Sequence, residues 1–301
     1  MGTIVYQEVN GINAENTAGA AAEEISRLEN LWSVFKPDSE VSQLRVSAGR
    51  HSIKVSPDTY FILSEAKRFY DTTLGAFDIT VLPLVEIWGK GELENRAPTE
   101  NSINEGLQLN GFRDMNFGPG NTVFLNKKGQ GVDLGGIGKG YAADCCKNVY
   151  IEKGIRHAIL NIGGNVLVHG CKPDGSPWRI GIRKPDGLSD EWMGYIEAEN
   201  CSVVTSGSYE RYFVINGCRY SHIIDPITGL PIKNDISSVT IISVSSTEAD
   251  ALATACYVLG AQKSLALIED MPGVEALIID NKGAIHITAG IKNRFHFSQS
   301  N

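Results

Sequence analysis

The chain has 301 residues and a net charge of −8, and its composition is that of a globular protein, with 42% hydrophobic and 21% charged residues. Its length allows one large domain or two moderate ones with an ample core. The sequence contains no run of basic residues longer than two, which excludes the extended positive surface typical of nucleic-acid binding. It also contains no apolar stretch of about 18 residues, so we expect no transmembrane segment.

Hydrophobic spacing, caps and turn residues predict helices and strands in an irregular order. Helices are predicted at residues 14–32, 57–75, 98–110, 136–154, 246–260 and 262–270. Strands are predicted at 3–9, 178–183, 192–199, 210–215 and 236–244, and hairpins at 115–135, 157–170, 213–221 and 274–287. The polar stretch 33–44 is predicted as a loop. Because strands do not alternate regularly with helices, we expect an α+β fold with mixed or antiparallel sheets.

The whole chain, residues 1–301, is predicted to form a single domain, with the segment 85–105 as a candidate peripheral lobe. The six cysteines include no C-x-x-C pair, so a zinc site is not expected. They indicate reduced thiols in a reducing compartment rather than a disulfide framework.

The glycine-rich segment VDLGGIGKGYAAD, at 132–144, places Asp133 at the end of a strand and Lys139 at the start of a helix. Glycines let backbone N–H groups approach a phosphate at a helix N-terminus, and a lysine adds positive charge. The segment therefore suits an anion, although tight packing of a strand against a helix explains it equally well. It is not a nucleoside-triphosphate phosphate loop, because Gly140 stands where that motif has Ser or Thr.

The segment EADALATA places Asp250 and Thr254 one turn apart on the same face of a predicted helix. A carboxylate and a hydroxyl at this spacing suit a hard cation such as Mg²⁺. The commoner explanation is structural: an exposed Asp250 in the first turn would interact favourably with the helix dipole, and Thr254 would be a packed hydroxyl.

The segment HIIDPITG, at 222–229, follows a predicted hairpin with an Asn-Gly turn, so we expect His222 and Asp225 at the exposed end of a strand. Pro226 restricts the backbone there, and Asp225 can orient the imidazole as the carboxylate of a catalytic triad does. An ordinary histidine, with a pKa of ~6.5, suits a general base near neutrality. A hydrogen-bonded corner histidine is nevertheless the commoner finding.

A further carboxylate, Asp78, follows a helix-ending glycine in GAFDIT at 75–80, where a structural turn is the commoner explanation. Eight short segments, taken in their order along the chain, carry a resemblance to a known family. They are MGT at 1–3, SVFKPDSEVSQL at 33–44, GAFDITVLPLVEIWG at 75–89, VDLGGIGKGYAAD at 132–144, NIGGN at 161–165, TSGSYERYF at 205–213, HIIDPITGLPI at 222–232 and ADALATA at 249–255. In these segments the chain resembles the ApbE family, flavin transferases that use FAD to attach FMN to proteins.

The resemblance covers nearly the whole chain and implies an activity. A Thr or Ser hydroxyl of an acceptor flavoprotein attacks the FMN phosphorus of FAD, AMP leaves, and Mg²⁺ assists. It also implies an elongated α+β fold with FAD in a cleft.

The resemblance implies site residues by position. Asp250 and Thr254 match the metal-binding pair, and Gly136 matches a position whose main-chain carbonyl contacts the metal. Asp133 and Lys139 match contacts with FAD.

Other positions match contacts with the nucleotide or the flavin. Phe35 stands where the family has an aromatic residue near the flavin, and Ala76, Phe77 and Asp78 match a nucleotide contact. His222 matches the histidine of the family's H-x-x-D-P motif near the pyrophosphate.

Members of this family are commonly exported lipoproteins, whereas this sequence begins at the MGT motif. A cytoplasmic protein is expected as written, and the alternative is an exported, membrane-anchored protein whose leader was removed. Two other functions fit the same segments: an FAD pyrophosphatase that releases FMN and AMP, and a non-catalytic flavin-binding protein. An NAD(P)-dependent oxidoreductase is disfavoured because the dinucleotide-binding fingerprint is missing.

Overall fold

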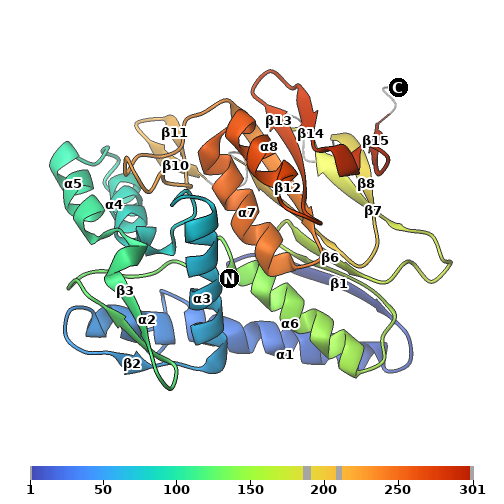
Figure 1. Cartoon of the computed structure of the whole chain (residues 1–301), viewed down its shortest axis with the longest axis horizontal. Helices are drawn as coiled ribbons and strands as arrows, with labels where there is room; N and C mark the ends of the chain where they lie inside the picture. The colour runs from blue at the N-terminus through green and yellow to red at the C-terminus, as the bar shows by residue number, and fades with distance from the viewer. Residues whose placement is uncertain (1, 186–190, 208–211, 299–301) are drawn as a thin grey trace. The chain divides into compact units, whose positions relative to one another are not determined.

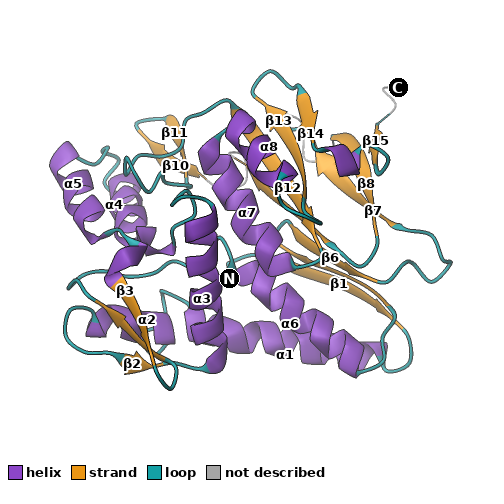
Figure 2. Cartoon of the chain, viewed as in Figure 1, coloured by secondary structure: helices purple, strands orange, loops and turns teal. Residues whose placement is uncertain are grey.

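The computed structural model describes residues 2–185, 191–207 and 212–298 (Figures 1 and 2). The α-helices are α1 Ala14–Trp32, α2 Glu40–Ser47, α3 Pro57–Thr72, α4 Leu82–Leu93, α5 Glu100–Leu109, α6 Gly138–Glu152, α7 Ser246–Leu259 and α8 Ala261–Glu269. Short 3₁₀ helices are η1 Ile79–Val81, η2 Phe112–Asp114 and η3 Ala289–Ile291. The strands are β1 Val5–Asn10, β2 Ile53–Lys54, β3 Met115–Gly118, β4 Thr122–Leu125, β5 His157–Ile162, β6 Asn165–His169, β7 Trp178–Arg183, β8 Trp192–Ala198, β9 Ser202–Gly207, β10 Tyr212–Ile215, β11 Cys218–Ser221, β12 Ile236–Ser243, β13 Glu275–Asp280, β14 Ile285–Ile287 and β15 Phe295–Phe297.

The chain divides into two compact units. The first comprises the described residues within 1–26, 139–209 and 235–301, and the second comprises those within 27–138 and 210–234. None of the helices in the described ranges is both long enough and apolar enough to cross a membrane.

The first unit is built on a seven-stranded sheet in the order β1-β5-β6-β9-β12-β13-β14, with every neighbouring pair antiparallel. Strand β12 is buried along its whole length, as expected for a strand covered on both faces. A three-stranded sheet, β15-β8-β7, shares an apolar core with the larger sheet. That core includes Trp178 of β7, Ile196 of β8 and Val203 of β9.

Helices α6 and α7 belong to the same unit, where α7 packs against β9 and β12. Helix α7 begins after Ser245, whose hydroxyl accepts the N–H of Glu248, and ends at Gly260, which has a φ of 85°. Helix α6 is attached to the sheet by the buried Tyr150, whose hydroxyl donates to Oε1 of Gln7 in β1 at 2.9 Å.

The N-terminal turns of α6 and α7 are joined by two carboxylates, each of which accepts backbone N–H groups of the other helix. Asp250 of α7 accepts the N–H of Gly140 in α6 at 2.9 Å. Asp144 of α6 accepts the N–H groups of Ser246 and Thr247 in α7, both at 2.9 Å. Both contacts are favourable because these N–H groups lack partners within their own helix and carry the positive end of its dipole.

The second unit contains α2 to α5, a three-stranded antiparallel sheet in the order β2-β4-β3, and the β10–β11 hairpin. An apolar cluster joins α4, α5, the hairpin and the segment that follows it. Its buried members are Leu84, Trp88, Ile103, Ile215 and Ile224. This cluster supports the segment that carries the H-x-x-D-P motif.

The antiparallel sheets and packed helices confirm the α+β fold class predicted from the sequence. The predicted Asn-Gly turn is also confirmed, since Asn216 and Gly217 have φ values of 50° and 75°, as a type I′ hairpin turn requires. Met1, residues 210–211 of the predicted strand, and residues 208–211 of the motif at 205–213 lie outside the described residues.

Some local predictions are wrong. The stretch 33–44 is not a loop throughout, because α2 begins at Glu40 after a cap by Ser39. Helix α4 was not predicted; its glycines, Gly89 and Gly91, have low helix propensity, and burial of Trp88 overrides that preference.

The segment 85–105, which covers most of α4 and part of α5, contributes Trp88 and Ile103 to the apolar cluster of the second unit. The single-domain organisation over residues 1–301 and its peripheral lobe stay predictions.

We expect Gly140→Ala to destabilise the protein. A methyl group there would lie 2.2 Å from the carbonyl oxygen of Ser246 and 2.8 Å from Cβ of Asp250. Such overpacking costs ~1–3 kcal/mol, more than the ~1 kcal/mol that Ala gains over Gly in a helix. Denaturant unfolding monitored by circular dichroism measures the difference.

Gly19→Ala is the matched control, because no atom of the described residues beyond the adjoining part of helix α1 itself lies within 4 Å of the added methyl group. It should be neutral or stabilising. Equal stability of the two variants would contradict the close contact between α6 and α7.

Candidate functional site

The first unit brings the two candidate residues Lys139 and Asp250 together at the joined helix ends. Nζ of Lys139 lies 3.1 Å from Oδ1 and 3.4 Å from Oδ2 of Asp250. The Asp250 side chain is 3% exposed and that of Lys139 23%. Asp250 therefore receives a cation and a backbone N–H in a nearly dry setting, and Lys139 neutralises its charge.

The expectation that Asp250 is an exposed first-turn carboxylate is wrong. It is the fifth residue of α7 and is 2% exposed. The sequence pattern could not reveal this burial, because it results from contact with α6, whose residues lie more than a hundred positions away.

The ammonium of Lys139 lies against Asp250, the carboxylate of the predicted metal site. Thr254 follows Asp250 by one turn of α7 and is half-buried. No group of three or more His, Cys, Asp or Glu side chains suited to a metal occurs in the described ranges. Mg²⁺ commonly uses only one or two carboxylates together with water and substrate phosphates, so Asp250 and Thr254 fit a partial site of this kind.

The glycine-rich loop before α6 lies in the second unit, up to Gly138. Oδ1 of Asp133 accepts the N–H of Gly135 at 2.7 Å, and the carbonyl of Leu134 accepts those of Ile137 and Gly138. These N–H groups are therefore engaged within the protein, which limits the predicted backbone cradle for phosphate. Lys139 is therefore the main candidate for binding a phosphate at this loop. The roles of Gly136, through its carbonyl, and of Asp133 stay predictions.

The segment GAFDIT also lies in the second unit, with its predicted nucleotide contacts buried. Ala76 is 6% and Phe77 3% exposed, and the Phe77 ring packs edge-on against Phe69. Contact of these residues with a nucleotide would thus go through backbone atoms. Phe35, by contrast, is 92% exposed, so its ring is accessible to a flavin.

The carboxyl group of Asp78 is buried and caps η1. Its Oδ1 accepts the backbone N–H of Thr80 at 2.8 Å and lies 2.7 Å from the Thr80 hydroxyl. Burial raises the pKa of Asp78 to about 6, against the opposing effect of hydrogen bonds from Thr80 and from the Phe112 backbone.

His222 directly follows β11 and is half-buried, as is Asp225. Oδ1 of Asp225 accepts the backbone N–H of Ile227 at 2.8 Å and that of Thr228 at 3.4 Å. The carboxylate therefore organises its own turn, a common role of Asp in loops. Its predicted orientation of the His222 ring stays a prediction.

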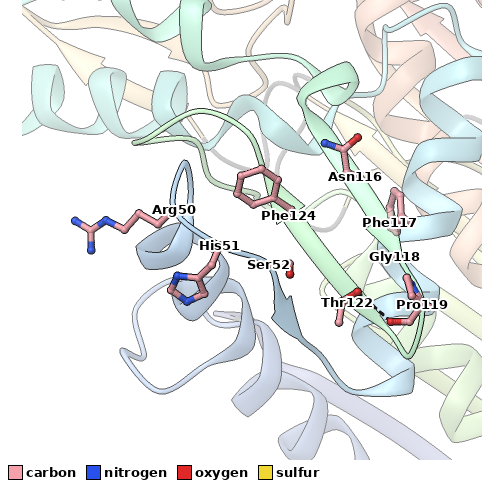
Figure 3. Close-up of a pocket in the computed structure, with 9 residues that line it drawn as sticks. All are labelled: Arg50, His51, Ser52, Asn116, Phe117, Gly118, Pro119, Thr122 and Phe124. Atoms are coloured by element: carbon pink, nitrogen blue, oxygen red, sulfur yellow. Dashed lines mark hydrogen bonds between the residues drawn. The ribbon is translucent and has the colours of Figure 1, made fainter.

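A pocket elsewhere in the second unit contains none of the predicted site residues (Figure 3). Its lining comprises Arg50, His51, Ser52, Asn116, Phe117, Gly118, Pro119, Thr122 and Phe124. Figure 3 shows Arg50 and His51 directed away from the strand that carries Phe124. We do not assign the chemistry to this pocket, since its charged groups do not converge.

Sequence reasoning missed two polar residues that hold the candidate segments in place. Asp144 stands inside the quoted glycine-rich motif, and its spacing of four from Gly140 was a usable signal. Asn110, which donates to the Pro226 carbonyl at 2.7 Å, gave no signal because its partner lies 116 residues away.

Comparison with known proteins places the chain in a class. The model of the ApbE family matches residues 1–278. The FAD:protein FMN transferase of Treponema pallidum is 35% identical over 98% of this chain and 86% of the relative. That of Escherichia coli K12 is 31% identical over 94% of this chain and 83% of the relative.

Solved structures agree with this match. The ApbE protein of Thermotoga maritima superposes with a TM-score of 0.88 at 36% identity, covering 97% of this chain and 96% of that one. The flavin transferase ApbE of Vibrio cholerae gives 0.86 at 30% identity, covering 98% and 96%. The chain belongs to the ApbE family.

Stability should depend on the charge of Asp78. Its pKa rises from 3.8 to about 6 on folding, so the folded chain binds this proton more tightly than the unfolded chain. The contribution of the neutral acid is fully present below about pH 4 and is lost as pH rises through 6. The loss is of the order of 2–3 kcal/mol.

Asp78→Asn removes the titration, so we expect the variant to gain stability relative to the wild type between pH 4 and 7. Denaturant midpoints at both pH values measure the difference. A difference between variant and wild type that does not change with pH would show that Asp78 has an ordinary pKa.

Proposed function

We propose that this chain, a flavin transferase of the ApbE family, catalyses Mg²⁺-dependent transfer of FMN from FAD to a Thr or Ser hydroxyl of an acceptor flavoprotein, with release of AMP. The names of its relatives, FAD:protein FMN transferases, support the FAD substrate and the protein acceptor. The observation that carries the proposal is the buried Asp250 carboxylate, which pairs with the ammonium of Lys139 at the joined N-termini of α6 and α7.

The proposed reaction replaces the AMP oxygen on the FMN phosphorus with the hydroxyl oxygen of the acceptor. The acceptor hydroxyl oxygen forms a bond to the FMN phosphorus, and the bond from that phosphorus to the oxygen of AMP breaks. His222 takes the proton of the attacking hydroxyl, and AMP leaves with the electron pair of the broken bond. In such transfers most of the catalysis comes from positioning and from stabilisation of charge on the phosphate oxygens.

Residues of this chain can supply both effects. Lys139 has a flexible stem, so its ammonium can pair with the phosphate oxygens of FAD as well as with Asp250. Asp250, Thr254 and the Gly136 carbonyl would hold Mg²⁺, which when bound neutralises phosphate charge. Phe35 offers an exposed ring for stacking on the flavin.

The test of this proposal is the product. The protein is incubated with FAD, Mg²⁺ and a candidate acceptor, and the acceptor is analysed by intact-protein mass spectrometry. An adduct of the mass of FMN on a Thr or Ser, with an equal amount of AMP, is expected. Free FMN and AMP without an adduct would instead identify an FAD pyrophosphatase, and FAD bound without turnover would identify a flavin-binding protein.

His222→Asn should slow transfer by ~10²–10⁴-fold, the usual contribution of a general base. Binding of FAD, measured by fluorescence titration, should be unchanged, because asparagine keeps a polar group of similar size. His51→Asn is the control: His51 lies in the same unit but lines the unrelated pocket of Figure 3. Near wild-type turnover of His222→Asn at saturating FAD and acceptor would show that His222 is structural.

Asp250→Asn should abolish the stabilisation of the FAD complex by Mg²⁺. Asparagine can still accept the N–H of Gly140 but carries no charge for a cation. In the wild type, Mg²⁺ at a hundred times its Kd adds ~2.7 kcal/mol to the free energy of unfolding, which raises Tm by several degrees. Asp174→Asn, at an exposed carboxylate of the same unit, should respond like the wild type, and an equal Mg²⁺ response of Asp250→Asn would remove the metal assignment.

A further inference from the structure

Three hydrogen bonds link the buried carboxyl of Asp78 to the turn that follows His222. Oδ1 of Asp78 lies 2.7 Å from Oγ1 of Thr80, which lies 2.7 Å from Oδ1 of Asn110. Nδ2 of Asn110 lies 2.7 Å from the carbonyl oxygen of Pro226. All four residues belong to the second unit, although they come from segments far apart in the sequence.

The protons in this series can be counted. Thr80 has one hydroxyl proton, yet its oxygen lies within hydrogen-bonding distance of two acceptor atoms, one on Asp78 and one on Asn110. The backbone N–H of Gly111 also donates to this hydroxyl, at 2.7 Å. Thr80 can therefore satisfy only one of the two acceptors with its own proton.

The orientation of Asn110 settles which acceptor receives it. The Pro226 carbonyl can only accept, so Asn110 must direct its amide nitrogen there and its oxygen to Thr80. The reverse orientation would place two oxygens 2.7 Å apart. Thr80 thus donates to Asn110, and the short contact between Thr80 and Asp78 requires a proton on Oδ1 of Asp78. The remaining lone pair of this protonated oxygen still accepts the backbone N–H of Thr80 at 2.8 Å.

We propose that Asp78 acts as a neutral acid that donates to Thr80, and that Thr80 and Asn110 are positioning residues that fix the Pro226 turn beside His222. The importance of this turn for transfer rests on the proposed function, whereas the hydrogen-bond series does not.

The surroundings of Asp78 favour the neutral form. The carboxyl group is 7% exposed, and burial is the largest cause of its raised pKa. Hydrogen bonds from Thr80 and from the Phe112 backbone lower this pKa but do not outweigh burial, and no charged side chain of the described ranges is among the causes. A bond in which Asp78 is the donor also favours the neutral acid.

Loss of the proton would reverse the first bond and break the second. An ionised Asp78 would take the proton of Thr80, which would leave the oxygens of Thr80 and Asn110 facing each other without a hydrogen. Asn110 would then move, and the Pro226 carbonyl would lose its donor. Other anchors keep the turn folded, since Nε1 of Trp88 donates to the carbonyl of Gly229 at 2.9 Å.

The first experiment detects the proton. Infrared spectra of the wild type at about pH 5, where exposed carboxyl groups with a pKa of ~4 are mostly ionised, should show the carbonyl stretch of a buried carboxylic acid. Asp78→Asn should remove this band. Thr80→Val should shift the frequency of the band, because Asp78 loses the oxygen to which it donates. Thr80→Ser should keep the wild-type frequency, because serine retains the hydroxyl. Absence of the band in the wild type would overturn the proposal.

The second experiment follows the turn. Asn110→Ala should accelerate hydrogen exchange at the backbone N–H groups of Asp225 and Gly229, which close the turn. It should lower kcat for transfer about fivefold, as expected for one lost hydrogen bond of ~1 kcal/mol, with an unchanged Kd for FAD. Asn101→Ala is the matched control, because Asn101 bonds only to Glu105 within α5 among the contacts of the described residues.

Equal exchange in Asn110→Ala and Asn101→Ala would overturn the role of Asn110. This comparison does not use Asp78→Asn, so it holds whether or not that variant folds. Asn110 itself is only half-buried, so we expect Asn110→Ala to fold. If the wild type transfers no FMN, the proposed function fails, and the infrared band and the exchange rates still decide the present inference.

Discussion

The structure of the candidate site depends on two reciprocal contacts, in which one carboxylate of α6 and one of α7 each accept backbone N–H groups from the first turn of the other helix. Asp250 accepts the N–H of Gly140, and Asp144 accepts those of Ser246 and Thr247. On each helix the donors and the acceptor are three or four residues apart, so both contacts form on facing sides of the two helices. The absent side chain of Gly140 allows the backbones to approach, since a methyl group would overlap the carbonyl of Ser246. The two helix ends are therefore fixed by charge and by shape at once.

This arrangement explains how Asp250 can be buried and still carry the negative charge that the proposed metal site needs. An unpaired buried carboxylate is unfavourable, whereas Asp250 receives a backbone N–H at the positive end of α6 and the ammonium of Lys139. A metal cation bound here would displace Lys139, whereas the N–H of Gly140 would keep the carboxylate in place. Asp78 shows the opposite solution, because no charged partner among the described residues offsets its burial and its pKa rises to about 6.

The sequence predicted the features that depend on local spacing. The face shared by Asp250 and Thr254, the Asn216-Gly217 turn and the helix after the glycine-rich loop follow from periodicity and backbone preferences. The burial of Asp250 and the role of Asn110 could not be predicted, because each results from a partner more than a hundred residues away. Asp225 was expected to orient His222, yet the hydrogen bonds of its Oδ1 close the local turn.

The central claim is that the two carboxylate contacts hold α6 and α7 as one unit, and amide hydrogen exchange of the protein carrying Asp144→Asn tests it most directly. The substitution weakens the bonds to Ser246 and Thr247, so exchange at these two amides should accelerate. If the helix ends are fixed together, exchange at Gly140, whose own acceptor Asp250 is intact, should accelerate as well. Faster exchange at Ser246 and Thr247 with an unchanged rate at Gly140 would show that the two contacts act independently, and would contradict the account.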